Sequence, residues 1–307
     1  MTRFFSEYII VIILFGSVFN MKIGFIGLGI MGESMCENIV KKHNDTVYCN
    51  DHKQSQIDKL CSFGCVGCAT NEEVAEKADI IITMIPTGRH VKETYTKLLP
   101  YLKEGKICID MSTIEPSVSV EVAKEVMATG AEFADCPVVR SKADAIKGTL
   151  GVLAGCKKEL FEKIKPILEY VGCTIIYMGE NGKGLAAKIC HNTLVAQISN
   201  GVNETVLLAQ KLGISIDNFA AAVAAGGAQC AYMAVQKENL KNEDWTTAFS
   251  MENMDKDVNI CYNIAKEEGF SMPAMEVVKG ILDEGVRRGW GKQDFRQTYR
   301  IVRGDEE

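Results

Sequence analysis

The chain has 307 residues, of which 47% are hydrophobic, and a formal net charge of −6 with its acidic residues dispersed. This length is sufficient for two domains that each bury a core. The charge provides no basic field for nucleic acid, so a small soluble molecule is the expected partner.

Residues 8–19 form an apolar run that is too short to span a bilayer as a helix but has the size of a signal-peptide core. Glu7 abuts this run, and no A-x-A site follows before Met21. We therefore interpret residues 1–20 as an extension upstream of a second candidate start at Met21. A cytoplasmic protein without membrane attachment, whose twelve cysteines are reduced, is expected.

The segment that follows Met21 has the pattern of a dinucleotide-binding unit. Its parts, in order, are the strand Lys22–Ile26, the glycine turn Gly27-x-Gly29-x-x-Gly32, the helix Glu33–Lys42 and the strand Thr46–Cys49. Glycines in such a turn let the backbone approach a pyrophosphate at the helix N-terminus, where N–H groups and the helix dipole favour anions. The segment therefore predicts a nicotinamide dinucleotide cofactor, bound by Gly27, Gly29, Met31 and Gly32.

Asp51 comes directly after the second strand. A carboxylate in this place accepts hydrogen bonds from the ribose hydroxyls of NAD and repels a 2′-phosphate. NADH is therefore the expected cofactor. NADP is the alternative if Asn50 takes this place instead, although no arginine follows within the next few residues.

Cys61, Cys65 and Cys68 have the spacing of an iron–sulfur site. They lie, however, between the second and third strands of a dinucleotide fold, in a chain where cysteine is common throughout. We therefore expect no metal.

The alternation of strand and helix continues to residue 178. The predicted strands are Asp79–Pro86, Lys106–Asp110, Ala131–Asp135, Thr149–Ala154 and Thr174–Met178, and the predicted helices are 90–99, Pro116–Thr129 and Lys157–Val171. Ligand-binding groups in parallel sheets lie past the carboxyl ends of strands. Pro86 and Thr87, and likewise Ser112 and Thr113, are therefore candidate cofactor contacts, with turn or capping roles as the alternative.

Residues 179–213 begin with three glycines, continue without proline, and end at Gly213. This pattern predicts one long helix between two domains. Lys188 and Asn192 lie one turn apart on this otherwise apolar helix, where polar side chains need partners and a ligand is a candidate.

Beyond Gly213 the sequence predicts only helices. They are Asp217–Ala225, Gln229–Asn239, Glu252–Glu268, Pro273–Gly289 and Gln293–Val302. The predicted fold is α/β, with a Rossmann-type dinucleotide-binding domain (21–182) joined by a long helix to an all-α domain. The long helix and the all-α domain together form residues 183–307. Lys256 and Asp257, within the third of these helices, form an acid–base pair whose plain interpretation is a solvated surface pair.

Five motifs occur in order along the chain. They are GxIGLGxMG at 24–32, Asp110-Met-Ser-Thr-Ile, Asp135-x-Pro-Val with Gly148-Thr-Leu, GxxGxGxxxKxxxN at 179–192, and Lys256-Asp257. From Met21 to about residue 302 the chain thereby resembles the β-hydroxyacid dehydrogenases, which include 3-hydroxyisobutyrate dehydrogenase. The resemblance implies an NAD(P)-dependent oxidoreductase acting on CH–OH groups, assembled as a homodimer or homotetramer.

The resemblance also implies roles for four side chains. Lys188 matches the family's catalytic lysine, which is the general acid when an aldehyde is reduced. Asn192 matches a residue that orients the substrate, Lys256 one near nicotinamide and substrate, and Thr113 one beside the nicotinamide. Chemistry supports Lys188 independently, because hydride transfer to a carbonyl leaves negative charge on oxygen, which an ammonium stabilises and then protonates.

One motif departs from the family's pattern. Most members have Asp-x-Pro-Val-Ser-Gly-Gly, whose last three residues cradle a substrate carboxylate, whereas this chain has Arg140 and Ser141 in the two glycine positions. These residues resemble the Gly-Arg-Thr motif of 3-sulfolactaldehyde reductases. His191 and Val195 stand where an asparagine and a serine are expected for a sulfonate.

The expected reaction is therefore the reduction of a small anionic aldehyde, best matched by conversion of 3-sulfolactaldehyde to 2,3-dihydroxypropane-1-sulfonate. The alternatives are succinic semialdehyde, giving 4-hydroxybutyrate, and the semialdehydes of 3-hydroxyisobutyrate or tartronate metabolism. A non-catalytic, cofactor-binding interaction module predicts loss of the lysine, and imine reductases of similar architecture usually replace it, whereas Lys188 is present.

Overall fold

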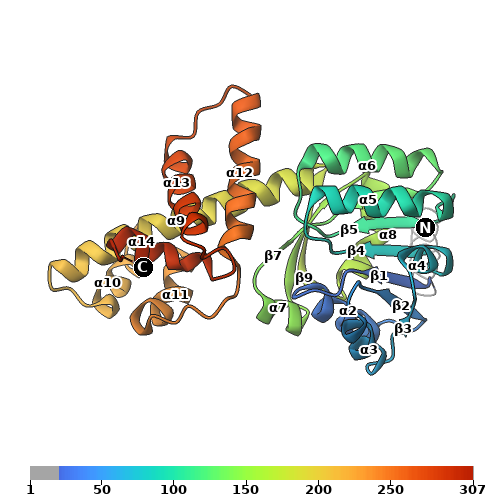
Figure 1. Ribbon diagram of the computed structural model, residues 1–307, viewed down its shortest axis with the longest axis horizontal. Helices are drawn as coiled ribbons and strands as arrows, with labels where there is room; N and C mark the ends of the chain where they lie inside the picture. The colour runs from blue at the N-terminus through green and yellow to red at the C-terminus, as the bar shows by residue number, and fades with distance from the viewer. Residues whose placement is uncertain (1–20, 307) are drawn as a thin grey trace, which may run out of the picture. The chain divides into compact units, whose positions relative to one another are not determined.

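The computed structural model describes residues 21–306, so the interpretation of residues 1–20 as an extension lies outside the described residues. The chain forms two compact units, of which the first ends at Lys188 and the second begins at Ile189. The first contains a nine-stranded sheet with helices, and the second is helical (Figure 1). The predicted α/β fold class, with a Rossmann-type domain followed by a helical domain, is confirmed.

Six neighbouring strands of the first unit form one parallel block. They are β1 (Ile23–Ile26), β2 (Val47–Asn50), β3 (Val66–Gly67), β4 (Ile80–Thr83), β5 (Ile107–Asp110) and β6 (Glu132–Asp135), in the spatial order β3-β2-β1-β4-β5-β6. After β1 the chain forms β2 and β3 on one side of β1, and β4 then pairs with the opposite side of β1. The carboxyl ends of β1 and β4 therefore flank the switch point where ligands bind in sheets of this kind.

The sheet continues past β6 with three strands. The strand β8 (Leu150–Gly155) pairs antiparallel with β6 and with the two-residue β7 (Val138–Val139), whereas β9 (Gly172–Gly179) runs parallel to β8. The short strand β7 is absent from the sequence-based prediction, because two residues carry too little periodicity to identify a strand.

The predicted strand at 79–86 is too long at its carboxyl end, since β4 stops at Thr83. The N–H of Met84 still donates to the Ile26 carbonyl, at 2.9 Å. The next N–H, that of Ile85, donates instead to the Ser112 hydroxyl at 2.8 Å. The ladder is thus replaced by a side-chain bond, and the chain turns away from the sheet.

Helices cover both faces of the sheet. They are α2 (Gly32–Lys42), α3 (Gln54–Cys61), α4 (Asn71–Lys77), α5 (Gly88–Leu98), the 3₁₀ turn η1 (Leu99–Tyr101), α6 (Pro116–Ala128), α7 (Lys142–Lys147) and α8 (Lys158–Leu168). Along β4, Ile80 and Ile82 belong to one apolar core with α2 and α8, while Ile81 belongs to a second core with α4, α5 and α6. Side chains alternate between the faces of a strand, so an unbroken apolar run is what two cores require.

The long helix α9 (Lys183–Lys211) begins in the first unit and continues into the second. The other helices are α10 (Ile216–Ala224), α11 (Ala231–Asn242), α12 (Met251–Glu267), α13 (Pro273–Arg287), the 3₁₀ turn η2 (Phe295–Gln297) and α14 (Thr298–Arg303). The last predicted helix, 293–302, is therefore wrong in its first turns, because the Asp294 side chain accepts the N–H of Arg296 and starts a 3₁₀ turn. Within residues 21–306, none of the helices combines the length and apolarity needed to cross a membrane.

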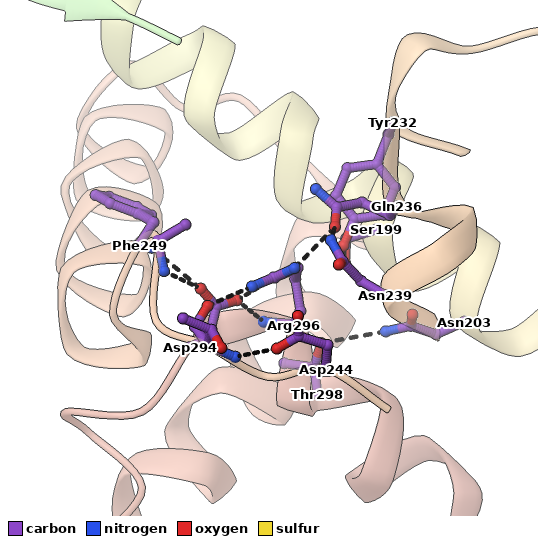
Figure 2. A network of polar contacts seen from close by, with 12 residues as sticks. Ser199, Asn203, Tyr232, Gln236, Asn239, Asp244, Phe249, Asp294, Arg296 and Thr298 are labelled. Carbon is purple, nitrogen blue, oxygen red and sulfur yellow. Dashed lines mark hydrogen bonds and ion pairs between the residues drawn. The ribbon is translucent and has the colours of Figure 1, made fainter. Parts of the chain in front are cut away.

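A buried ion pair holds the segment that leads into α12 (Figure 2). Asp294 bonds the Arg296 guanidinium at 2.5 Å and also accepts the N–H groups of Ala248 and Phe249 at 2.7 and 3.1 Å. The guanidinium in turn donates to the Thr246 carbonyl at 2.6 Å. Removing one partner of such a pair costs roughly 3–5 kcal/mol, because the other charge stays buried. The network therefore fixes the start of the helix that carries Lys256.

Candidate active site

The glycine turn joins β1 to α2 as predicted. Gly27 has a φ of +95°, and a Cβ on it would collide with the Met84 carbonyl oxygen. Gly32 is the first residue of α2, after Met31 at the N-cap position. A Cβ on Gly29 would meet no atom within 4 Å, so this side of the turn is open. Backbone N–H groups at an open helix N-terminus fit the pyrophosphate of a dinucleotide.

Asp51 is the first residue after β2, and its carboxylate lies against the glycine turn. Its Oδ2 accepts the N–H of Leu28 at 2.7 Å. Asn50 is buried, and its amide donates to the Cys68 carbonyl at 2.7 Å. The Asn50 side chain is therefore committed to the main chain, and Asp51 is the polar group that β2 presents at the turn.

The loops after β4 and β5 are tied together by Asp110, which is 1% exposed. One oxygen of this carboxylate accepts the hydroxyls of Thr83 at 2.7 Å and Ser112 at 2.6 Å. Burial raises the pKa of Asp110, while these hydroxyls oppose the shift. Ser112 is thus an internal link between the loops.

The remaining candidates in these two loops differ in their surroundings. Thr87 accepts the N–H of His90 and so caps α5, as the alternative interpretation expects. Pro86 is exposed and Thr113 is half-buried, and both lie beyond the carboxyl ends of strands. Pro86 and Thr113 therefore stay candidate cofactor contacts.

Arg140 has a backbone φ of +85°, in the left-handed region that favours glycine. For other residues this region costs on the order of 1–3 kcal/mol. The exposed guanidinium donates to the Thr149 carbonyl at 2.6 Å. The neighbouring Ser141 donates its hydroxyl to Asp144 at 2.6 Å in a capping box that starts α7. Arginine thus occupies a backbone conformation that is suited to glycine.

Lys188 lies on the second turn of α9 and is 9% exposed. It is the last residue of the first unit, and Asn192 follows it by four residues on the same helix. Residues at this spacing lie on the same helix face. The helical spacing predicted from the sequence is therefore present.

In the second unit, Asn192 and Lys256 are brought together by Asp257, which the sequence indicates as the partner of Lys256 but not as a site residue. The amide of Asn192 donates to Asp257 Oδ2 at 2.6 Å, and Lys256 Nζ lies 3.2 Å from Oδ1 of the same carboxylate. Asp257 is 1% exposed, so the interpretation of this pair as solvated is wrong for the acid. Its position beside Lys256 in the fifth motif was the available signal.

The three closely spaced cysteines do not share one environment. Cys61 is exposed, whereas Cys65 and Cys68 are buried, and the Cys65 thiol donates to the Val47 carbonyl at 3.1 Å. Burial raises the pKa of Cys68 to about 11. Across the described part of the chain, no three His, Cys, Asp or Glu side chains are grouped to hold a metal ion.

Comparison with known proteins agrees with this geometry. Residues 22–179 match the family described as the NAD-binding domain of 6-phosphogluconate dehydrogenase, and residues 182–302 match the NAD-binding domain of NADP-dependent 3-hydroxyisobutyrate dehydrogenase. The 2-hydroxy-3-oxopropionate reductase of Escherichia coli is 30% identical over 89% of this chain and 94% of its own length. The 2-(hydroxymethyl)glutarate dehydrogenase of Eubacterium barkeri is 29% identical over 92% and 95%.

Among solved structures, the 3-hydroxyisobutyrate dehydrogenase of Mycobacterium tuberculosis with L-serine superposes with a TM-score of 0.86. It is 26% identical and covers 92% of this chain and 99% of its own. With the glycine turn and the buried lysine in place, these matches show that the chain belongs to the β-hydroxyacid dehydrogenase family, NAD(P)-dependent oxidoreductases that act on CH–OH groups.

Proposed function

We propose that the protein is an NADH-dependent reductase of a small anionic aldehyde, with 3-sulfolactaldehyde as the best match and 2,3-dihydroxypropane-1-sulfonate as its product. The observation that carries the reaction type is Lys188, a nine-tenths buried lysine on α9. The nicotinamide, when bound, supplies the hydride. Lys188 stabilises the negative charge that develops on the substrate oxygen and donates the proton.

Two further side chains support substrate binding. Asn192 lies one turn beyond Lys188, and Asp257 fixes its amide, so it presents an oriented hydrogen-bonding group. Lys256 is the second proposed substrate contact, with an ammonium whose charge Asp257 offsets in part at 3.2 Å. The two relatives named above are enzymes of hydroxy acids, which carry a carboxylate, and this agrees with an anionic substrate.

Arg140 is the proposed partner of the anionic head, with Ser141 beside it. Within residues 21–306, its guanidinium donates to the Thr149 carbonyl and the Cys173 thiol, and the nearby Asp144 carboxylate also feels its charge. A guanidinium fork suits the three oxygens of a sulfonate and also pairs with a carboxylate. The choice between these acids therefore depends on measurement.

The test is an assay panel with NADH and NADPH. The substrates are 3-sulfolactaldehyde, succinic semialdehyde, methylmalonate semialdehyde and tartronate semialdehyde. We expect the highest kcat/KM with sulfolactaldehyde and NADH. Faster turnover of succinic semialdehyde identifies a carboxylate-specific reductase, and no turnover of any aldehyde with either cofactor identifies a non-catalytic module.

We further infer a cytoplasmic homodimer or homotetramer. All twelve cysteines are free thiols, which supports a reducing compartment. Leu208 on α9 and Leu212, the first residue after this helix, are 58% and 70% exposed, which supports burial in an assembly. Light scattering coupled to gel filtration measures the oligomer, and a monomer at all concentrations would contradict it.

A further inference from the structure

Asp135, the last residue of β6, joins the sheet to the start of α9. Its side chain is fully buried. Oδ1 accepts the N–H of Gly182 at 2.6 Å, and Oδ2 accepts the N–H of Leu185 at 2.9 Å. The first N–H groups of a helix have no partner inside the helix. One carboxylate therefore satisfies two of them, at the positive end of the helix dipole.

The first turn of α9 is packed directly onto the ends of the strands. A Cβ on Gly184 would collide with the Leu153 carbonyl oxygen and lie 2.9 Å from Asp135 Oδ2. A second tie comes from Asn181, whose amide donates to the carbonyls of Phe133 at 3.0 Å and Gly155 at 3.2 Å. The start of the helix cannot slide or rotate without breaking these bonds.

Burying the Asp135 carboxylate at the start of a helix costs desolvation free energy. Burial raises the pKa of Asp135 to about 7, although both N–H bonds oppose the shift, and nearby Asp110 adds to it. An exposed serine or aspartate caps a helix without such desolvation. What the buried acid adds is a fixed position for the helix relative to β6.

Lys188 lies three residues after Leu185, so the direction of its side chain follows from the first turn of α9. We propose that Asp135 is a positioning residue for the reduction, because it fixes the first turn of α9 and thereby the ammonium of Lys188. This inference rests on the proposed role of Lys188 as general acid. A displacement of about 1 Å at a reacting group can cost roughly 100-fold in rate.

The first test is Asp135→Asn, which keeps the shape but turns an NH₂ group towards one of the helix N–H donors. We expect kcat to fall roughly 10- to 100-fold, as for a misplaced catalytic group. The dissociation constant of NADH, measured by fluorescence, should stay unchanged. The primary isotope effect with deuterated NADH should rise, because hydride transfer becomes rate-limiting. A weaker NADH affinity with unchanged kcat would overturn the proposal.

The second test is a double-mutant cycle that combines Asp135→Asn with Lys188→Ala. Methylamine is added to the proteins that lack Lys188, as an external general acid that makes their activity measurable. If Asp135 acts through Lys188, Asp135→Asn lowers the activity of the native enzyme but not that of the Lys188→Ala variant. Equal losses in both backgrounds would overturn the inference. Full activity of the single variant Lys188→Ala without methylamine would instead refute the proposed general acid. This outcome is distinct from a failure of the Asp135 proposal, because it does not involve Asp135→Asn.

Two more variants distinguish a positioning effect from a loss of folded protein. Asn181→Ala removes the second tie without disturbing a buried charge, and it should show a smaller loss of kcat with the same rise in isotope effect. Asp79→Asn is the matched control, since Asp79 accepts the Lys22 N–H at 2.9 Å at the amino end of β4. Its kcat should be unchanged. Loss of kcat in the control but not in Asn181→Ala would overturn the assignment.

Discussion

Asn192 donates a hydrogen bond to Asp257 across 2.6 Å, and both side chains are buried. A carboxylate only accepts, so the bond fixes the NH₂ group of the amide towards Asp257. The amide oxygen then lies 3.1 Å from His191 Nδ1. Asn192 is therefore held in one orientation by a residue 65 positions away along the chain.

We predict that Asp257→Asn lowers kcat/KM about 10- to 100-fold, because an unsatisfied buried group costs roughly 1–3 kcal/mol and Asn192 is free to flip. The double variant with Asn192→Ala should be no worse than Asn192→Ala alone. Asn259→Ala is the control, since this α12 amide bonds Asp255 at 3.0 Å in a similar pair. Full activity of Asp257→Asn would contradict the prediction.

Lys188→Ala should remove turnover and leave NADH binding nearly intact, because the glycine turn holds the pyrophosphate. General acid catalysis is worth roughly 10²–10⁴-fold, so the loss in kcat should be at least about 100-fold. Lys183→Ala, an exposed lysine on the same helix, is the matched control and should keep full activity. Steady-state kinetics of the folded variants decide, and an active Lys188→Ala would refute the assignment.

NADH should be preferred over NADPH, because Asp51 presents a negative charge where a 2′-phosphate would lie. Asp51→Ser should weaken NADH use and narrow the preference. The ratio of kcat/KM values for the two cofactors measures this in both proteins. A native enzyme that prefers NADPH would show that Asp51 does not face the ribose.

Arg140→Gly and Arg140→Ala should have similar activities but different stabilities. Both remove the guanidinium, so both should lose kcat/KM for the anionic aldehyde by roughly 2–4 kcal/mol, as for a truncated charge pair, and lose much less for a neutral aldehyde. Only glycine relieves the backbone at a φ of +85°. Arg140→Gly should therefore be more stable than Arg140→Ala by about 1 kcal/mol in urea unfolding. Equal stabilities would show that the backbone relaxes.

Asp255 should make stability depend on pH. Burial and the nearby Asp283 raise its pKa to about 6, above the unfolded value of about 3.9. Folding thus favours the protonated form, and this stabilising contribution is complete below about pH 4 and lost as the pH rises through about 6. Asp255→Asn should raise the thermal midpoint at about pH 8 but not at about pH 4. Equal shifts at both values would refute the prediction.

The sequence by itself determined the dinucleotide unit, the long helix and the positions of Lys188 and Asn192 on it. These features depend on periodicity and turn chemistry within short segments: a glycine turn between strand and helix, and polar residues one helical turn apart. Such patterns are local, so they are readable without knowing the path of the chain. The sequence also favoured Asp51 over Asn50 as the residue that faces the ribose, but it left both open. The hydrogen bond from Asn50 to the Cys68 carbonyl supports the choice of Asp51.

Only the tertiary structure decided the contacts between distant segments. The Asp135 carboxylate meets N–H groups 47 and 50 residues away, and Asp257 meets Asn192 across 65. The left-handed backbone at Arg140 likewise depends on the strand β7 and the helix α7 on either side of it, which set the direction of the chain at this residue. The path of the strands and helices decides which side chains meet. Burial then requires each buried polar group to have a partner, because a buried polar group without one is destabilising.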